Sequence, residues 1–217
     1  LLGGLYANRI SLISTEQGVG VRMAGDAAAS VADFTLNAAG NIQLNNQISS
    51  KQAIEIQSSS TQQQKLDIQG RLTANNISIG EANWQKLNVD VEGGTLYASS
   101  TLDLQSQALN ANNAKIQAKD VLKVNANADI TLQNTLLDAA DLQVKSNTFN
   151  AQDAQFKSAQ NLDIQTAQDL KFKNTNAEVQ NNIVLNAANG NIELSGGTLE
   201  AGNALELKAN QLTQSAQ

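Results

Sequence analysis

The 217-residue sequence contains no cysteine, no histidine and no proline. Without cysteine there can be no disulfide, no thiolate metal site and no cysteine nucleophile. Without histidine the chain lacks the side chain best suited to proton transfer near neutral pH. We therefore predict no catalytic residue, no metal site and no cofactor. Absence of cysteine is compatible with export but does not establish a compartment.

Aromatic residues and long apolar runs are also scarce. Only 3% of the residues are aromatic, although the 41% that are hydrophobic suffice for a core. No apolar run approaches the roughly 18 residues of a membrane-spanning helix. The amino terminus has no basic region followed by an apolar stretch, so we expect any export signal to lie outside this sequence.

Charge of either sign is limited and dispersed. The formal net charge of -6 arises from 20 acidic and 14 basic residues that occur singly or in pairs. Proteins that bind nucleic acid neutralise phosphates with a basic stripe, and none occurs here. The sequence therefore predicts no nucleic-acid partner.

What the sequence does contain is a repeat. The 27 Asn and 24 Gln residues separate short triplets in which two apolar residues flank a third residue. One column of triplets starts at Phe34, Ile54, Ile77, Leu102, Leu122, Leu142, Leu162, Ile183 and Leu205. A second starts at Ile42, Leu66, Leu87, Leu109, Ile130, Phe149, Leu170, Ile192 and Leu212. A third starts at Ile48, Leu72, Leu96, Ile116, Leu136, Phe156, Val179 and Leu199.

The apolar residues of each triplet are two apart, which is the period of a strand rather than of a helix. Segments rich in Asn, Ala, Ser and Gly separate the triplets and tolerate the left-handed conformations of tight corners. A fixed period of about 20 residues is typical of a solenoid. The predicted fold is all-β, a right-handed parallel β-helix with three short strands per coil and roughly ten coils.

Two details refine this prediction. The third column repeats a signature, Gly93-Gly94-Thr95-Leu96-Tyr97-Ala98 and Gly196-Gly197-Thr198-Leu199-Glu200-Ala201, and its frequent closing Ala predicts a narrow apex. Longer steps around Ile77 and Leu102 predict a loop at 80–86, and residues 57–64 predict an expanded corner. Asn residues at matching corners are expected to stack amide on amide.

Outward side chains are expected to stack along the rod as well. Lys171 lies in register with Glu193, and Lys123 with Asp103, so both pairs could form exposed ion pairs. Such pairs contribute only tenths of a kcal/mol, about the median of exposed salt bridges.

Loops are where a solenoid would carry a binding site. The candidate binding residues in and near the loop at 80–86 are Glu81, Asn83, Trp84, Lys86 and Tyr97. Trp84 with Tyr97 would suit a sugar-stacking platform, although isolated aromatics on a rod are more often local packing. Scattered acids could form a calcium site or carboxylate pair, but solvated strand faces explain them better; examples are Asp67, Asp103, Asp141 and Asp163.

The opening segment carries a resemblance. Residues 2–21 read LGGLYANRISLISTEQGVGV. They resemble the junction that closes the secretion domain of filamentous-haemagglutinin-type exoproteins, a family that includes contact-dependent growth-inhibition toxins. The Asn-rich coils that follow are similar to the haemagglutinin repeats of that family. The resemblance implies that 1–33 is the C-terminal end of the secretion domain and its junction, and that 34–217 is the shaft.

The resemblance also implies a cellular context. It implies secretion through an outer-membrane transporter of the two-partner type, recognised through an N-terminal domain that is missing here. The chain would then be secreted or displayed at the surface of a Gram-negative cell, associated with the outer membrane. Asn-Pro-Asn-Gly motifs cannot occur without proline, there is no Arg-Gly-Asp tripeptide, and no toxin domain is visible.

Three functional hypotheses follow. The leading one is a structural shaft that presents an adhesive or toxic tip to other cells. The second is a binding module whose loops contact a glycan or a cell-surface receptor. The third is a carbohydrate-active β-helix enzyme, which the lack of a convergent polar constellation disfavours. The last coil has no capping helix, so end-to-end self-association of isolated chains is also expected.

Overall fold

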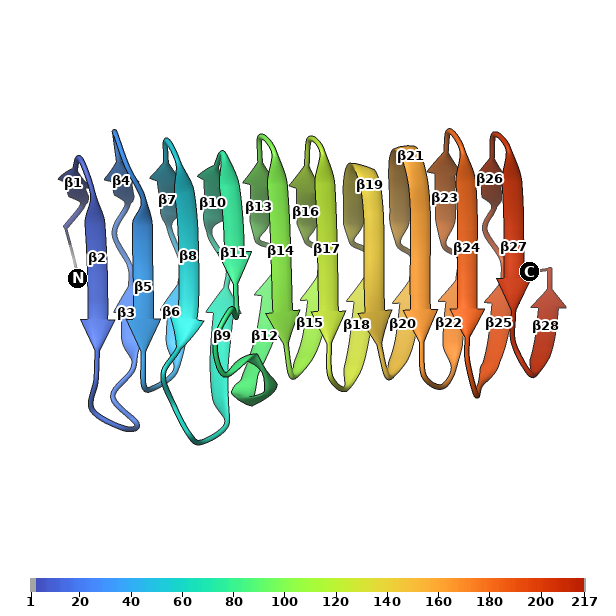
Figure 1. The fold of residues 1–217 in the computed structure, drawn as a ribbon, viewed down its shortest axis with the longest axis horizontal. Coiled ribbons are helices and arrows are strands. Elements are labelled where there is room, and N and C mark those ends of the chain that lie inside the picture. The colour runs from blue at the N-terminus through green and yellow to red at the C-terminus, as the bar shows by residue number, and fades with distance from the viewer. Residues whose placement is uncertain (1–2, 217) are drawn as a thin grey trace.

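A computed structural model describes residues 3–216 as one continuous parallel β-helix (Figure 1). In Figure 1 the chain descends at the front, rises at the back and advances from the N-terminus at the left, which makes the helix right-handed. It completes about ten turns with a spacing of about 21 residues. The predicted fold class is therefore confirmed. No helix in 3–216 has the length and apolar character needed to span a membrane.

Each coil contributes one strand to each of three faces, numbered here as the predicted columns were. The first face comprises β2 (Ile10–Ser14), β5 (Phe34–Ala38), β8 (Ala53–Ser58), β11 (Asn76–Ile79), β14 (Thr101–Ser106), β17 (Val121–Ala126), β24 (Asn182–Ala187) and β27 (Ala204–Lys208). The third face comprises β1 (Leu5–Ala7), β4 (Ala27–Ala29), β7 (Gln47–Ser50), β10 (Arg71–Ala74), β13 (Thr95–Ala98), β16 (Lys115–Ala118), β23 (Asn176–Val179) and β26 (Leu199–Ala201). Two long strands, β19 (Leu136–Ser146) and β21 (Gln155–Thr166), run from the third face onto the first.

The second face is a separate ten-stranded sheet. It comprises β3 (Val21–Met23), β6 (Ile42–Leu44), β9 (Gln64–Ile68), β12 (Leu87–Glu92), β15 (Ala108–Asn112), β18 (Asp129–Gln133), β20 (Thr148–Gln152), β22 (Leu170–Lys173), β25 (Asn191–Ser195) and β28 (Gln211–Ser215). The only helix among the described residues is a short 3-10 turn, η1 (Trp84–Lys86).

Strand pairing confirms the predicted first column completely. Phe34 pairs with Ile54, and every later member pairs with the next, as far as Ile183 with Leu205. These side chains point inward and are buried, apart from Leu205 in the last coil. Stacking thus gives each aliphatic residue a neighbour in the adjacent coil, and burial accumulates along the rod.

The narrow apex is also present, where the third face turns into the first. In seven successive coils the inward position there is occupied by small residues, namely Ala29, Ser50, Ala74, Ala98, Ala118, Ala139 and Ser158, and Val179 follows in the next coil. All of these side chains are buried.

A ladder of left-handed residues forms the corner between the second and third faces. It comprises Gly93, Asn113, Asn134, Asp153, Asn174 and Gly196, whose φ angles lie between 46° and 68°. The N–H group of each donates to a carbonyl of the following coil. The predicted amide stacking occurs here, since Asn134 Nδ2 donates to Asn113 Oδ1 at 2.6 Å.

This ladder corrects two positions of the predicted third column. In every coil that has a ladder residue, the inward residue of the third face follows it by three positions. Ile116 accordingly pairs with Leu137 rather than Leu136, and Phe156 pairs with Ala177 rather than Val179. The predictions at Leu136 and Val179 were wrong because alternation alone does not fix the register.

A third correction lies on the second face. Leu66 pairs with Val89, whereas Leu87 pairs with Gln64. Both Leu87 and Val89 are buried. A shift of two residues keeps the same face inward, so the hydrophobic pattern could not distinguish the two alignments.

The aromatic core explains why an alanine occupies the third column. Phe149, Phe156 and Phe172 are buried together, and the ring centroids of Phe156 and Phe172 are 5.4 Å apart. Phe156 pairs with Ala177, and Phe172 pairs with Ala151. Phe156 and Phe172 therefore each have an alanine in one adjacent coil, which limits the change in core volume from coil to coil.

Of the two predicted ion pairs, one is present. Lys171 Nζ lies 3.3 Å from Glu193 Oε2. Lys123 is in register with Asp103 as predicted, but these two side chains do not form one of the ion pairs found in residues 3–216. The strands before residue 34 stack in register on the next coil, with Ile10 beside Phe34. The division at 33/34 stays a prediction.

Candidate functional site

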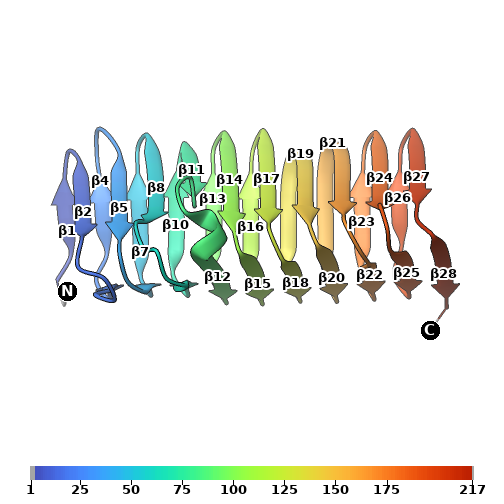
Figure 2. The same ribbon diagram turned by 60° about the horizontal axis from the view of Figure 1, so that its bottom comes forward.

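The predicted loop at 80–86 protrudes where the first face meets the second, and η1 stands out from the rod in Figure 2. It begins at Gly80, whose φ of 85° is left-handed and whose Cβ, if present, would collide with the Gln105 carbonyl. Only glycine fits this position without displacing the backbone. The loop therefore leaves the rod at a fixed point.

Polar contacts hold the loop against the preceding coil. Asn83, with a φ of 54°, donates from Nδ2 to the Ser58 carbonyl at 3.3 Å. Gln57 Nε2 donates to Glu81 Oε2 at 3.0 Å. Trp84 is half-buried at the start of η1, whereas Lys86 is exposed. Four of the five predicted site residues thus lie together on one anchored loop.

Two further expanded corners extend this surface. Residues 15–20 and 59–63 protrude at the same corner, and Ser60 Oγ donates to Gln17 Oε1 at 3.3 Å. Asn88, near the start of β12 just after the loop at 80–86, donates from Nδ2 to Gln63 Oε1 at 3.2 Å. We call the three segments 15–20, 59–63 and 80–86 the corner ridge. The sequence analysis missed the first segment because its columns began only at Phe34.

Carboxylates gather on the first face beside this ridge. Burial raises the pKa of Glu55, and the negative charges of Glu81 and Asp33 raise it further. Burial also raises the pKa of Asp103, although Lys123 opposes that effect. One oxygen of Asp103, Oδ1, is buried without a hydrogen-bond partner. No cluster of three or more possible metal-ligating side chains occurs in the part of the chain that the structure describes.

The fifth predicted residue, Tyr97, does not belong to this group. It lies on β13 in the third face, between Thr73 and Gln117 of the neighbouring coils. The third face lies opposite the corner that carries the ridge. Trp84 and Tyr97 therefore cannot form one sugar-stacking platform.

Three of the four scattered acids accept hydrogen bonds from amide side chains. Asn161 Nδ2 donates to Asp141 at 3.0 Å, and Gln69 Nε2 donates to Asp67 at 3.2 Å. Gln165 Nε2 likewise donates to Asp163. These contacts support the interpretation of the acids as parts of solvated strand faces.

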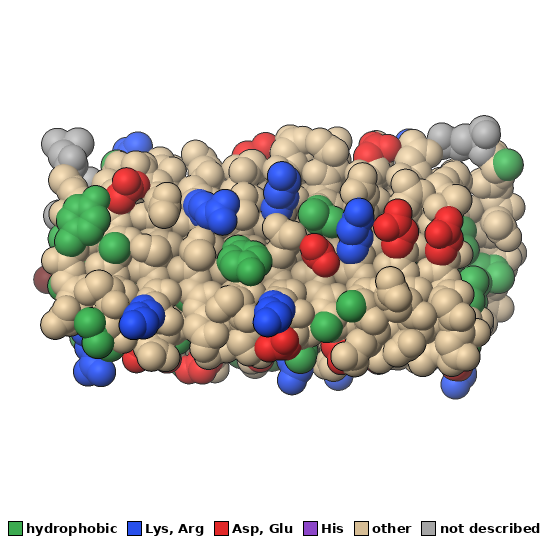
Figure 3. All heavy atoms as spheres, turned by 90° about the horizontal axis from the view of Figure 1, so that it is seen from above, with side chains coloured by type: hydrophobic (Ala, Val, Ile, Leu, Met, Phe, Trp, Pro, Cys, Tyr) green, Lys and Arg blue, Asp and Glu red, His purple; other side chains and the backbone are tan. Residues whose placement is uncertain are grey.

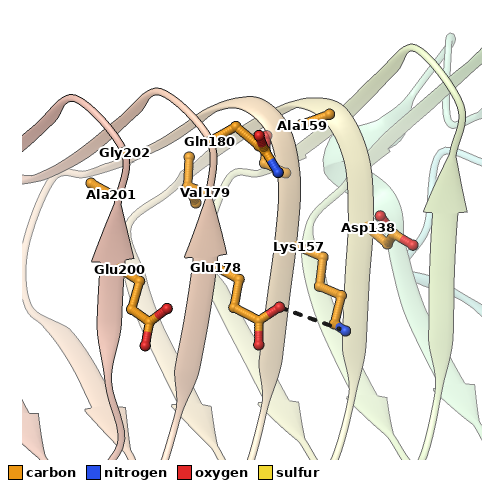
Figure 4. Close-up of a pocket in the computed structure, with 10 residues that line it drawn as sticks. Asp138, Lys157, Ala159, Glu178, Val179, Gln180, Glu200, Ala201 and Gly202 are labelled. Carbon is orange, nitrogen blue, oxygen red and sulfur yellow. Dashed lines mark ion pairs between the residues drawn. The ribbon is translucent and has the colours of Figure 1, made fainter.

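A hollow of about 650 Å³ lies on the third face near its C-terminal end (Figure 4). Its charged walls are Asp138, Lys157, Glu178 and Glu200, and Val179 contributes to its apolar part. Lys157 Nζ lies 3.7 Å from Glu178 Oε2, the ion pair drawn in Figure 4. The hollow therefore retains an excess of negative charge.

A shallow polar groove follows the second face. Two adjoining hollows of about 350 and 430 Å³ share Thr131 and Gln133 as lining residues. Towards the N-terminus its side chains bond to one another, as when Asn110 Nδ2 donates to Asp90 at 3.0 Å. Hydrogen bonds between its own lining side chains thus occupy part of the groove.

Comparison with known protein families identifies the repeat that forms these coils. The sequence profile described as haemagglutinin repeat matches residues 3–76, 67–137 and 110–216, and so nearly the whole chain. The chain belongs to the haemagglutinin repeat family. The repeats of this family account for the coils described above, and the family resemblance predicted from the sequence is confirmed.

Curated proteins similar to this chain include several that are named as nucleases and are much longer than it. The 16S rRNA endonuclease CdiA of Enterobacter cloacae is 31% identical over 241 residues, which cover 97% of this chain and 7% of that protein. The tRNA nuclease CdiA of Yersinia mollaretii is 28% identical over 208 residues, which cover 91% of this chain and 6% of that protein. The tRNA nuclease CdiA-2 of Burkholderia pseudomallei is 58% identical over 43 residues, 20% of this chain.

The chain therefore spans less than a tenth of the length of these curated relatives. The nuclease activities in their names are those of the whole proteins. No solved structure matches the chain.

Proposed function

We propose that this haemagglutinin-repeat chain is a shaft segment of a large secreted exoprotein and presents an adhesive or toxic tip to other cells. The observation that carries the proposal is the unbroken register of the first face, from Ile10 to Leu205. A rod of stacked coils can hold a distant domain at a fixed separation from the cell because each coil is held by its neighbours. Its length is set by the number of coils rather than by any one residue.

The proposed route to the surface follows from the family. Secretion would use an outer-membrane transporter of the two-partner type, and the protein would act at the surface of a Gram-negative cell. Within this scheme residues 1–33 close the secretion domain and 34–217 form the shaft. End-to-end association of isolated chains stays a prediction that concerns only the exposed end coils.

An in-register deletion tests the shaft function. Removing residues 102–141 from the full-length protein takes out two coils and joins Thr101 to Leu142, the register partner of Leu122 and thus of Leu102. We expect folding, display and tip activity to persist. The matched control removes residues 102–129 and joins Thr101 to Ile130, so that a strand of the second face directly follows the third face and one coil lacks its first-face strand; it should abolish display. Normal display with loss of activity after the in-register deletion would contradict the proposal.

The corner ridge supports a second candidate, a binding module for a glycan or a receptor. It is a protruding surface that joins Trp84 to charged and amide side chains, and it is anchored rather than loose. The test replaces residues 81–86 by the single-residue corner of the next coil, Gln107, and measures binding of purified chain to target cells. If the loop replacement abolishes binding and Tyr97→Ala does not, the result favours the binding-module function.

A further inference from the structure

The third face carries an ordered row of outward side chains. Strand register aligns, from coil to coil, Tyr97, Gln117, Asp138, Lys157, Glu178 and Glu200. A parallel row, two residues earlier in each strand, contains Arg71, Thr95, Lys115, Leu136, Gln155 and Asn176. The two rows together form one strip, which we call the third-face strip.

Charge is divided along this strip. Arg71 and Lys115, on β10 and β16, have no carboxylate within ion-pairing distance among the described residues. Towards the C-terminus the strip is dominated by the acids of the hollow, Glu178 and Glu200. Figure 3 shows basic side chains over the middle of the rod and acidic ones gathered towards its C-terminal end.

The strip also has an apolar knob. Tyr97 is 36% exposed, and Leu136 is half-buried nearby. The other large exposed hydrophobic side chains in 3–216 lie near the two ends of the rod, at Tyr6, Ile13, Val19, Val31, Leu205 and Leu212. Tyrosine is enriched among the side chains that contribute most of the binding energy at protein interfaces, where it fills a pocket on the partner.

We propose that the third-face strip binds the same strip of a second copy, with the two rods antiparallel. A two-fold axis perpendicular to the rods, between β19 and β21, makes the strip self-complementary. It sets Asp138 of each copy opposite Lys157 of the other. Lys115 of each copy comes within reach of Glu178 of the other.

The same axis sets Tyr97 against the C-terminal end of the strip in the other copy. The Tyr97 ring then enters the hollow, and its hydroxyl group can donate to the Glu200 carboxylate. By symmetry, Tyr97 of each copy enters the hollow of the other. The two surfaces are therefore complementary in shape as well as in charge. The hollow in Figure 4 is thereby assigned an occupant, the tyrosine of a second copy.

A parallel arrangement does not fit the same strip. Parallel rods would set each coil opposite its own equivalent, so that the basic part met the basic part and the acidic part met the acidic part. Juxtaposed like charges suppress association and opposite charges promote it. The antiparallel orientation is therefore selected by the sequence of charges along the strip.

The contact is narrow. It involves the six strands from β13 to β26 on the third face, roughly 30 Å at the usual strand spacing of about 4.8 Å, and is smaller than a standard interface of about 800 Å² per partner. We expect weak, salt-sensitive pairing of single chains. Pairing of isolated chains does not depend on the proposed shaft function, but its consequence does: antiparallel shafts would join cells that face each other.

Disulfide trapping tests the orientation, because the chain has no cysteine of its own. Asp138→Cys and Lys157→Cys are made in separate proteins, mixed and oxidised. The expected result is a heterodimer that forms more efficiently than either homodimer. Glu200→Cys alone is the matched control and should not cross-link to itself. Absence of the heterodimer, or efficient self-cross-linking of the control, overturns the proposal.

Charge exchange tests the chemistry in sedimentation equilibrium. Lys115→Glu and Glu178→Lys should each weaken self-association, and the double variant should restore it. Tyr97→Ala should weaken it too, whereas Tyr6→Ala, an exposed tyrosine of the first coil, should not. Circular dichroism checks that each variant is folded. Failure of the double variant to recover, or an equal loss with Tyr6→Ala, would show contact through another surface such as the rod ends.

Discussion

The N-terminal and C-terminal halves of the rod share the same three strands but differ in their corners. Up to β12, three of the four coils carry an expanded corner, at 15–20, 59–63 and 80–86. From Gly93 onward the corner between the second and third faces instead repeats a left-handed residue in six successive coils. Coil length accordingly varies in the first half and is nearly constant in the second.

This difference shows which part of a coil is free to vary. Ile54, Ile77 and Leu102 stay in register although loops of different length separate them. Insertions are tolerated at corners because the loop remains in solvent, whereas a residue inserted into a strand would reverse its faces. Binding surfaces can therefore evolve on the first half without loss of the rod.

The largest expected effect lies in the aromatic core of the second half. Phe156→Ala removes a ring that packs on Phe172 and should lower the free energy of unfolding by about 3–5 kcal/mol. Tyr97→Ala, which removes an outward side chain of the same face, should change the free energy of unfolding by about 0.5 kcal/mol or less. Guanidinium unfolding would be followed by circular dichroism and by Trp84 fluorescence. If the two probes separate in Phe156→Ala, the halves unfold as different units; if they coincide, the rod is one cooperative unit.

A second pair of variants checks the register that the ladder imposes. Leu137→Ala should cost about 2–5 kcal/mol because Leu137 is 1% exposed, whereas Leu136→Ala should cost well under half of that. Urea unfolding of both variants measures the difference. Equal losses would mean that the corner at Asn134 does not set the register.

Alanine substitutions at two glycines distinguish the backbone strain of a left-handed residue from the steric clash of an added Cβ atom. Gly18 and Gly80 have φ angles of 80° and 85°, but a Cβ would meet nothing at Gly18 and the Gln105 carbonyl at Gly80. Alanine should cost about 1–2 kcal/mol at Gly18 from strain alone. Gly80→Ala should cost more, and thermal unfolding measures both. A cost at Gly80 no larger than at Gly18 would show that the ridge can shift without disturbing the rod.

The smallest effect concerns pH. Because burial, Glu81 and Asp33 raise the pKa of Glu55 in the folded state, the folded chain binds more protons than the unfolded chain. Stability should therefore fall as the pH rises from the ordinary glutamate pKa through the raised one. Glu55→Gln should remove part of this slope and slightly stabilise the chain at neutral pH. Unfolding curves between pH 4 and 7 check this, with the exposed Glu206→Gln as a control; an unchanged slope would contradict it.

Much of the fold could be predicted because burial has a simple period. Residues such as Leu102 and Leu122 recur with alternation and constant spacing, and both features follow from strands stacked on one core. The loop at 80–86 was also predicted, because a long step must leave the core. The error at Leu136 arose because two leucines are adjacent at 136–137, and the error at Val179 arose because a small residue, Ala177, holds the preceding inward position.

The candidate site was predicted less completely. Four residues of one loop were found because they are adjacent in sequence. The expanded corner predicted at 57–64 is present at 59–63. The segment 15–20, the contact of these corners with one another and the separation of Tyr97 from Trp84 depend on which coil edge each residue occupies. The charge pattern of the third-face strip is likewise invisible until the register aligns residues about 20 positions apart.

The sequence by itself determined a right-handed rod of three-stranded coils, since alternation, corner residues and a constant period admit few other ways to bury these side chains. Only the tertiary structure decided which residues meet across coils. That outcome depends on two contacts that no local pattern contains: the left-handed ladder that fixes the start of the third face, and the exchange of volume between Phe156 and Ala177. Both act between coils, where the energy of a solenoid resides.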